Sequence, residues 1–260
     1  LDESLSYSCA YFQAADDSLG AAQKAKLDYI CRKLRLRPGM RMLDMGCGWG
    51  ALILHAASDY GVEAVGLTVS PEQAEVARQR IRQAGMEQRC RVEVEDFFAW
   101  REPAGFDRIA SIGAAEHVPE SRFEEYFKLA VASLRPGGQF LHHAITRTLS
   151  ALDRPGRSYS HRYVFPDYFL ATIGETARAA EAAGFEVRDV ENLREHYALT
   201  LRHWLQRFEA AQGELQKQTD ELSCRVFRLY LAGSAYEFQS GRMHLHHSLL
   251  VKPDQGRSGV

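Results

Sequence analysis

Arg41-Met-Leu-Asp-Met-Gly-Cys-Gly-Trp-Gly-Ala51 is the stretch from which the architecture of this chain can be inferred. Its apolar first half predicts a short buried strand, and the glycines that follow predict a turn that leads into a helix near Leu52. Glycine has no Cβ, so the backbone of such a turn can take positive φ angles and can pass very close to a nucleotide-like ligand. Asp44, just before the turn, is placed to bind polar groups of that ligand.

Strands and helices are predicted to alternate outward from this stretch. Helical patterns begin at Ser18 and Pro71 and also cover about 120–134, 175–183 and 200–233, the last as one long helix or two joined helices. This alternation predicts an α/β fold with a parallel, doubly wound sheet of seven strands and helices on both faces. Ligands bind at the carboxyl ends of the strands in such a sheet. The predicted strands are residues 42–45, 62–67, 91–96, 107–112, 139–145, 185–190 and 241–251.

Local signals predict how some of these elements begin. Ser70 suits the N-cap of a helix and Pro71 suits its first position, and Gln73 is predicted to complete a capping box. Leu134-Arg-Pro-Gly-Gly138 predicts a tight turn before the strand at 139–145.

Residues 147–174 interrupt the alternation with a long aromatic segment. Long irregular segments inside a compact domain are commonly functional, so we expect this insertion to cover the substrate site. An ordinary surface loop with its own small cluster is the alternative. The tail from 253 to 260 is polar and is predicted to be frayed.

The composition limits the class of protein. The 260 residues carry a net charge of −2 and are 45% hydrophobic, which predicts a single domain over 1–260 and no nucleic-acid partner. Five cysteines without C-x-x-C spacing predict a reducing, cytoplasmic setting. No apolar run reaches about 18 residues, so neither a membrane span nor a signal peptide is predicted. Because the chain opens at Leu1 rather than Met, we expect upstream residues to be missing.

Two nucleotide ligands fit a glycine-rich turn of this kind. A dinucleotide site expects an acidic residue about 20 positions further on, to hold the ribose. Gly66-Leu-Thr68 occupies that place here. Many methyltransferases share the G-x-G-x-G pattern of Gly46, Gly48 and Gly50, where the ligand is S-adenosylmethionine. The sequence therefore favours S-adenosylmethionine over a nicotinamide cofactor.

Several blocks between Tyr7 and about Lys252 resemble the cyclopropane-fatty-acid synthases and mycolic-acid cyclopropane synthases. The resemblance implies a class I methyltransferase fold, which is Rossmann-like, and S-adenosylmethionine-dependent methylation of an alkene carbon. The product would be a cyclopropane or a methyl branch, formed through a carbocation. The blocks are Tyr7–Phe12, Leu43–Gly50, Gly66–Ser70 with Gln73, Asp107–His117, Leu141–Ile145, Tyr163–Asp167 and His196–Tyr197.

The resemblance also implies a role for particular residues. A bicarbonate ion would serve as the base, and S-adenosylmethionine would lie in a separate pocket; no metal is implied. The residues implied to hold bicarbonate are Cys9, Glu116, His143, Ile145 through its backbone, and Tyr197. Those implied to bind S-adenosylmethionine are Tyr7, Ser8, Asp44, Gly46, Gly48, Thr68, Gln73, Asp96 and Phe97.

The chain departs from the family pattern in the insertion, where residues 147–162 match poorly and Tyr168 replaces a glycine. The acceptor therefore stays open among an unsaturated lipid, a carrier-bound acyl chain and another alkene, and a lipid would require transient membrane contact. A small-molecule N- or C-methyltransferase, with Glu116 and His117 or His143 as base, is the alternative function. A binding protein without chemistry is a third hypothesis. The sequence does not indicate an oligomeric state.

Other polar residues suit structural roles. His142 neighbours His143 and is predicted to point to the opposite face of its strand, as a structural residue. His244, His246 and His247 lack Asp, Glu or Cys partners at a fitting spacing, so no metal site is predicted there. Residues 209–221 are predicted to form a solvated helix face.

Overall fold

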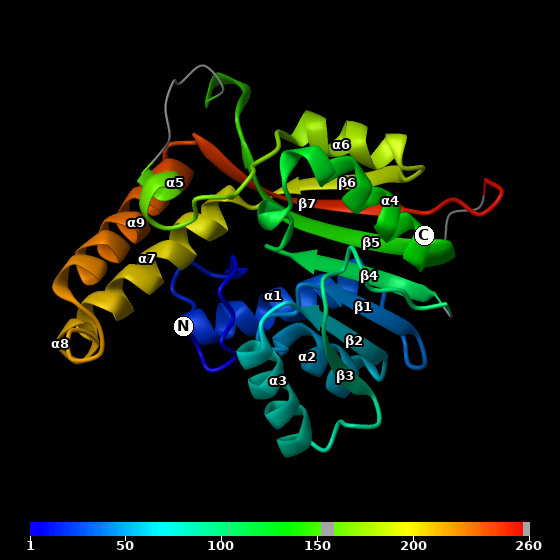
Figure 1. Cartoon of the computed structure of the whole chain (residues 1–260), viewed down its shortest axis with the longest axis horizontal. Coiled ribbons are helices and arrows are strands. Elements are labelled where there is room, and N and C mark those ends of the chain that lie inside the picture. The colour runs from blue at the N-terminus through cyan, green and yellow to red at the C-terminus, as the bar shows by residue number, and fades with distance from the viewer. Residues whose placement is uncertain (104, 152–158, 257–260) are drawn as a thin grey trace.

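Seven strands form one mixed sheet in the order β3-β2-β1-β4-β5-β7-β6 (Figure 1). The computed structural model describes residues 1–103, 105–151 and 159–256. Part of the predicted insertion (152–158) and the end of the predicted tail (257–260) lie outside the described residues. The strands are β1 (Arg41–Met45), β2 (Glu63–Thr68), β3 (Cys90–Val94), β4 (Phe106–Ile112), β5 (Leu134–Arg147), β6 (Glu186–Asn192) and β7 (Met243–Val251).

The predicted seven-stranded α/β sheet is confirmed, but its predicted directions are only partly right. The strands β1 to β5 pair in parallel, whereas β7 runs antiparallel to both β5 and β6. The strand predicted to begin at 139 begins earlier, because Leu134 already pairs with Phe106, and residues 135–138 of the predicted turn lie between this pair and the next one, Arg108 with Gln139. A shift in register between Phe106 and Arg108 absorbs the irregularity that Pro136 and the two glycines introduce.

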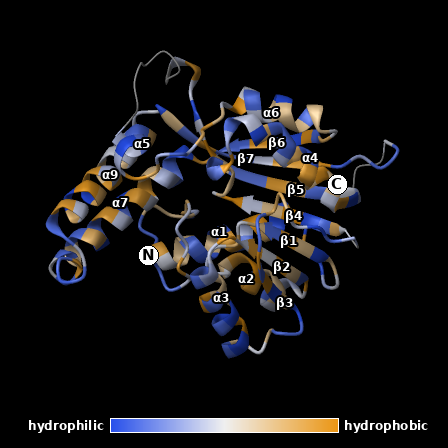
Figure 2. Cartoon of the chain, viewed as in Figure 1, coloured by the Kyte–Doolittle hydropathy of each residue, from blue (hydrophilic) through white to orange (hydrophobic). Residues whose placement is uncertain are grey.

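Helices cover both faces of the sheet (Figure 1). Successive residues of β1 show the division, since Met42 packs with α1, α2 and α3, and Leu43 packs with α4 and α6. Figure 2 shows that α2, which packs on the sheet, is mainly hydrophobic. The segment around α8, which lies away from the sheet, is mainly hydrophilic. The helices are α1 (Leu19–Lys33), α2 (Ala51–Tyr60), α3 (Pro71–Gln83), α4 (Phe123–Ser133), α5 (Tyr159–Tyr163), α6 (Ile173–Ala182), α7 (Arg194–Ala210), α8 (Gln212–Leu215) and α9 (Glu221–Gln239), with short 3-10 turns η1 (Ala115–His117), η2 (Glu120–Arg122) and η3 (Leu149–Ala151).

Capping side chains fix several helix starts. Ser18 and Ser70 each accept a bond from a backbone N–H of the first turn, as their sequence positions predict. Thr172 and Glu175 form a complete capping box, so α6 begins two residues before the predicted 175. The predicted helical segment 200–233 is in fact three helices, and α7 begins at Arg194. The earlier start matters because it places Tyr197 in the first turn of α7.

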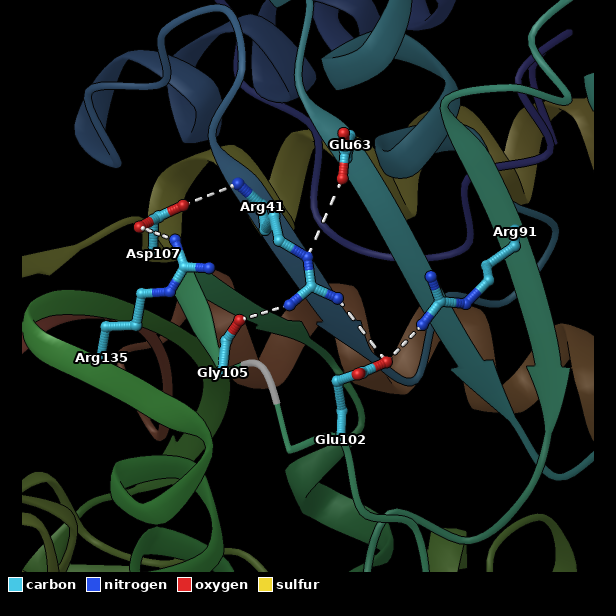
Figure 3. Close-up of polar contacts among 7 residues, drawn as sticks. All are labelled: Arg41, Glu63, Arg91, Glu102, Gly105, Asp107 and Arg135. Carbon is cyan, nitrogen blue, oxygen red and sulfur yellow. Dashed lines mark hydrogen bonds and ion pairs between the residues drawn. The ribbon is translucent and has the colours of Figure 1, made fainter.

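A network of charges holds the sheet at the edge where its strands begin. Arg41 opens β1, and its guanidinium lies between Glu63, Glu102 and the carbonyl of Gly105. Asp107 accepts the backbone N–H of Arg41 at 2.8 Å. Exposed ion pairs are individually weak, but several together favour one strand arrangement. Figure 3 shows the members of this network, which are Arg41, Glu63, Arg91, Glu102, Gly105, Asp107 and Arg135.

The helices α7 and α9 lie side by side beyond the sheet, and α5 of the insertion lies against α9 (Figure 1). Together with β7 and the N-terminal segment they bury a separate apolar cluster around Tyr197, Leu201 and Phe238. Within the described part of the chain, every helix is too short or too polar to cross a membrane.

Candidate active site

The glycine-rich turn joins the end of β1 to the start of α2. Gly46, Gly48 and Gly50 have positive φ angles of 94°, 52° and 81°. A Cβ on Gly46 would lie 2.5 Å from the Cβ of Ala114, and one on Gly48 would lie 2.9 Å from Cε1 of Tyr7. Backbone geometry and lack of room therefore both require glycine at these positions.

Two adjoining cavities open beside this turn. We call the larger, of about 340 Å³, the glycine-turn cavity. The smaller, of about 40 Å³, is the arm cavity, because the N-terminal segment forms one of its walls. Ser8 and Asp44 line the arm cavity, and the two cavities share Tyr7, Gly46 and Gly48. The other predicted cofactor residues line the glycine-turn cavity, and the full set there is Tyr7, Gly46, Gly48, Thr68, Gln73, Asp96 and Phe97.

A chain of hydrogen bonds connects three of these residues. Thr68 Oγ1 donates to Gln73 Oε1 at 2.9 Å, and Gln73 Nε2 donates to the hydroxyl of Tyr7 at 3.3 Å. The capping box predicted for Gln73 is therefore wrong: Ser70 caps the helix, but the Gln73 side chain turns toward the cavity. This orientation leaves Gln73 at the end of β2, where a ribose would lie in a nucleotide site.

Asp44 and Lys26 bring opposite charges to the arm cavity. Both side chains are buried, with 2% and 3% exposed, yet no ion pair within 4.0 Å joins them among the described residues. Asp44 Oδ1 is buried and has no hydrogen-bond partner among the described residues, and burial raises the pKa of this carboxyl to about 7. Burial also lowers the pKa of Lys26 to about 8, and its Nζ donates to Ser8 Oγ at 3.0 Å. A zwitterion placed between the two groups would satisfy both.

Lys26 is the principal residue that sequence reasoning missed in this part of the site. A signal was present, because Lys26 lies between Ala22 and Ile30 at helical spacing on the buried stripe of α1. A lysine on such a stripe is unusual, since lysine is almost never fully buried unless it is paired.

A third cavity, of about 180 Å³, also has Tyr7 in its wall, together with several further Tyr, Phe and Trp side chains; we call it the aromatic cavity. Glu116, His143, Ile145 and Tyr197 all line it, so the structure brings together four of the five residues predicted to hold the base. Tyr7, Gly113 and His117 line both this cavity and the glycine-turn cavity, and so form the junction between them.

Cys9 is the predicted base-site residue that does not line the aromatic cavity. Its thiol donates to the carbonyl of Ala10 at 3.2 Å and packs behind Tyr197 in the cluster of α7, α9 and β7. Burial raises the pKa of the thiol, which keeps it neutral and unreactive. The predicted contact of Cys9 with the base thus stays a prediction, and its thiol is hydrogen-bonded to Ala10 in this structure.

Glu116 lies in η1, just past β4, with only 8% of its surface exposed. Its Oε1 accepts the backbone N–H of Ile145 at 2.8 Å, so that N–H is already bonded within the protein. Oε2 of Glu116 is buried, and no hydrogen-bond partner for it is found in the part of the chain that the structure describes. Burial raises the pKa of this carboxyl to about 7, and the bond from Ile145 opposes part of that rise.

His143 and Tyr197 approach the same cavity from β5 and α7. Burial lowers the pKa of His143 and raises that of Tyr197, so both rings are neutral near pH 7. A neutral phenol remains a donor, and the Tyr197 ring is fixed against Phe238 with centroids 4.5 Å apart. As predicted, the preceding residue, His142, points to the other face of β5, where its Nδ1 lies 3.1 Å from the hydroxyl of Tyr126.

The far wall of the aromatic cavity was not predicted from sequence. Tyr230, Ser234 and Phe238 follow one another at four-residue spacing on α9, which was the available signal. The insertion contributes to the wall as expected, and its contacting residues are Ser160, Phe165, Tyr168 and Leu170.

The histidines near the end of the chain have other partners. His246 meets Thr146 Oγ1 at 2.8 Å, and His247 meets His143. In the described residues, no group of three or more His, Cys, Asp or Glu side chains is arranged to hold a metal ion.

Comparison with known proteins gives consistent matches. The family model described as mycolic acid cyclopropane synthetase matches residues 1–248. The chain is 38% identical to a probable fatty acid methyltransferase of Pseudomonas putida over 97% of its own length and 65% of that protein's. It is 37% identical to the cyclopropane-fatty-acyl-phospholipid synthase of Escherichia coli K12, over 94% and 62% of the two lengths. The chain thus spans less than two thirds of these curated relatives.

A solved structure is also similar across most of both chains. The mycolic acid cyclopropane synthase CmaA1 complexed with SAH and CTAB superposes with a TM-score of 0.91 at 34% identity. The match covers 97% of this chain and 92% of that chain.

Proposed function

This chain belongs to the mycolic acid cyclopropane synthetase family, and from that premise we propose that it is an S-adenosylmethionine-dependent methyltransferase acting on an alkene carbon of an unsaturated acyl chain. The observation that carries the proposal is the junction at Tyr7, Gly113 and His117. It connects a cavity suited to a nucleoside with an aromatic cavity that contains Glu116 and His143.

The arm and glycine-turn cavities fit S-adenosylmethionine. Gly46 and Gly48 allow close backbone approach, and the unpartnered Oδ1 of Asp44 suits the ammonium of an amino-acid group. Gln73 and Thr68 are proposed to bind the ribose, and Phe97 is proposed to stack on the adenine. S-adenosylmethionine would supply its sulfonium methyl to the alkene, which leaves a carbocation on the neighbouring carbon.

The polar end of the aromatic cavity fits a small planar anion. Tyr197 can donate its hydroxyl, and Glu116, with its raised pKa, can donate from Oε2 when protonated. Bicarbonate would accept the proton that the new methyl group loses, and the electron pair of that C–H bond would close a cyclopropane. Loss of hydrogen from a different carbon would give a branch instead. Because Ile145 is bonded to Glu116, it acts by fixing that carboxyl rather than by binding the anion.

The walls of this cavity suit the cationic stage. The faces of Tyr7, Tyr197 and Tyr230 can stabilise positive charge that water cannot reach. Leu201 and Leu245 supply apolar surface for a hydrocarbon chain. A lipid acceptor is therefore favoured over a small hydrophilic amine, and it would require transient contact with a membrane or with an acyl carrier.

The test is methyl transfer from 13C-methyl-labelled S-adenosylmethionine to vesicles that contain either unsaturated or saturated phospholipid. We expect label in the acyl chains of the unsaturated lipid alone, analysed by mass spectrometry after hydrolysis. Activity should fall when bicarbonate is removed from the buffer and return when it is added back. Label in an amine of a cell extract, with none in any acyl chain, would instead favour a small-molecule methyltransferase.

A further inference from the structure

His143 and His247 face each other across the β5–β7 pair. They are direct partners in the antiparallel register, and both side chains are buried, with 1% and 0% exposed. His143 Nδ1 lies 2.7 Å from His247 Nε2, which is a hydrogen-bond distance. One of the two nitrogens must therefore carry a proton and the other must accept it.

Both rings are neutral. Burial lowers the pKa of each, and the cation of Lys26 lowers both further. A neutral imidazole has one N–H and one lone pair, so the proton shared by the pair also determines the state of the two outer nitrogens. These outer nitrogens are Nε2 of His143, on a ring that lines the aromatic cavity, and Nδ1 of His247.

The two arrangements differ in what they leave unpartnered. If His143 donates, then His247 keeps a buried N–H at Nδ1, an atom for which residues 1–103, 105–151 and 159–256 offer no hydrogen-bond partner. His143 would then offer only a lone pair to the cavity. If His247 donates, its Nδ1 is unprotonated and leaves no buried N–H without an acceptor. His143 then carries its proton on Nε2, and this N–H can donate to an acceptor in the cavity.

We infer that His247 donates to His143 and acts as a positioning residue, holding His143 in the tautomer that presents an Nε2–H donor to the aromatic cavity. The inference rests on the proposed function only for the identity of the acceptor, which is the bicarbonate ion. The partner of a ligand histidine commonly fixes its tautomer in this way. His246 is a natural control, because it lies next in the strand, points to the other face and bonds Thr146.

The test is nitrogen NMR of the full chain labelled with 15N-histidine, with His143 assigned by comparison with His143→Gln. We expect Nδ1 of His143 to show the shift of an unprotonated nitrogen and Nε2 that of an N–H. His247→Gln, whose amide can still donate, should keep this pattern, as should His246→Gln. His247→Glu, which offers an acceptor, should reverse it and weaken bicarbonate binding about tenfold or more, measured by line broadening of 13C-bicarbonate.

The wild-type spectrum alone can overturn the inference, so it remains testable even where a variant fails to fold. A proton on Nδ1 of His143 would show that His143 is the donor and would reject the role given to His247. The expected tautomer together with no bicarbonate binding would leave this inference standing and would count against the proposed base.

Discussion

Glu116 accepts the backbone N–H of Ile145 through Oε1 at 2.8 Å, and this bond joins η1 to the carboxyl end of β5. The other oxygen, Oε2, is buried and has no hydrogen-bond partner within the described structure. The carboxyl is thus held in place but only half satisfied when ionised. This explains why burial raises its pKa from 4.5 to about 7 despite the bond from Ile145.

The raised pKa of Glu116 makes stability depend on pH. Between about 4.5 and 7 the folded state binds this proton more than the unfolded state does, so stability falls as pH rises through that window. Across that window Glu116 alone would lower the free energy of unfolding by on the order of 3 kcal/mol at most. The pKa of Asp44 is also raised to about 7, so Asp44 lowers the stability further as pH rises. Glu116→Gln keeps an acceptor for Ile145, so we expect a shallower fall. The free energy of unfolding is measured by urea denaturation at pH 5 and pH 8 without ligands. An equal loss of stability between the two pH values in the wild type and the variant would contradict the prediction.

Gly46→Ala should destabilise the protein severely. The new Cβ would meet Ala114 Cβ at 2.5 Å, and the φ angle of 94° is strained for alanine. We expect a loss of about 2–4 kcal/mol in the free energy of unfolding, measured by urea denaturation. Gly20→Ala is the control, since nothing lies within 4 Å of its Cβ and the residue is inside α1. It should stabilise by roughly 0.5–1 kcal/mol. Similar losses in both variants would show that crowding at the turn is not the cause.

The architecture was predictable because its signals are local. The run around Leu43 is apolar, the turn after it is rich in glycine, and Ser70 caps α3. Each of these elements can therefore be predicted from residues that are adjacent in the sequence. Strand direction has no such signal: the pattern at 241–251 fits either direction, and only the pairing with β5 and β6 makes β7 antiparallel.

The site was predictable where a motif names its residues and was missed where packing selects them. The residues Glu116, His143 and Tyr197 follow from the resemblance, and the structure places them around one cavity. Lys26 and Ser234 carry no motif, and their positions depend on contacts between segments far apart in sequence. The capping role predicted for Gln73 failed for the same reason, because the direction of a side chain is set by neighbours, here Tyr7, that the sequence does not reveal.

Lys26→Met should weaken the binding of S-adenosylhomocysteine about tenfold but should leave the affinity for 5′-methylthioadenosine unchanged. The physical reason is that Lys26 lines the arm cavity opposite Asp44, where a carboxylate of an amino-acid group would meet its charge. Methylthioadenosine lacks that group. Calorimetry with the two ligands separates the effects, and Lys24→Met, an exposed change on the same helix, is the matched control. Equal weakening of both ligands would mean that Lys26 only holds the N-terminal segment through Ser8.

Ser234→Phe should block long acceptors without disturbing the cofactor site. Ser234 is half-buried on α9 and lines the aromatic cavity beside Tyr230, so a phenyl ring there would occupy space that an acyl chain needs. We expect turnover of long unsaturated acyl chains to fall about tenfold or more, while S-adenosylhomocysteine affinity stays unchanged. Leu229→Phe, on the same helix but 59% exposed, should leave both quantities intact. Because the aromatic cavity is the proposed place of the acyl chain, undiminished turnover in the Ser234 variant would mean that the chain enters elsewhere.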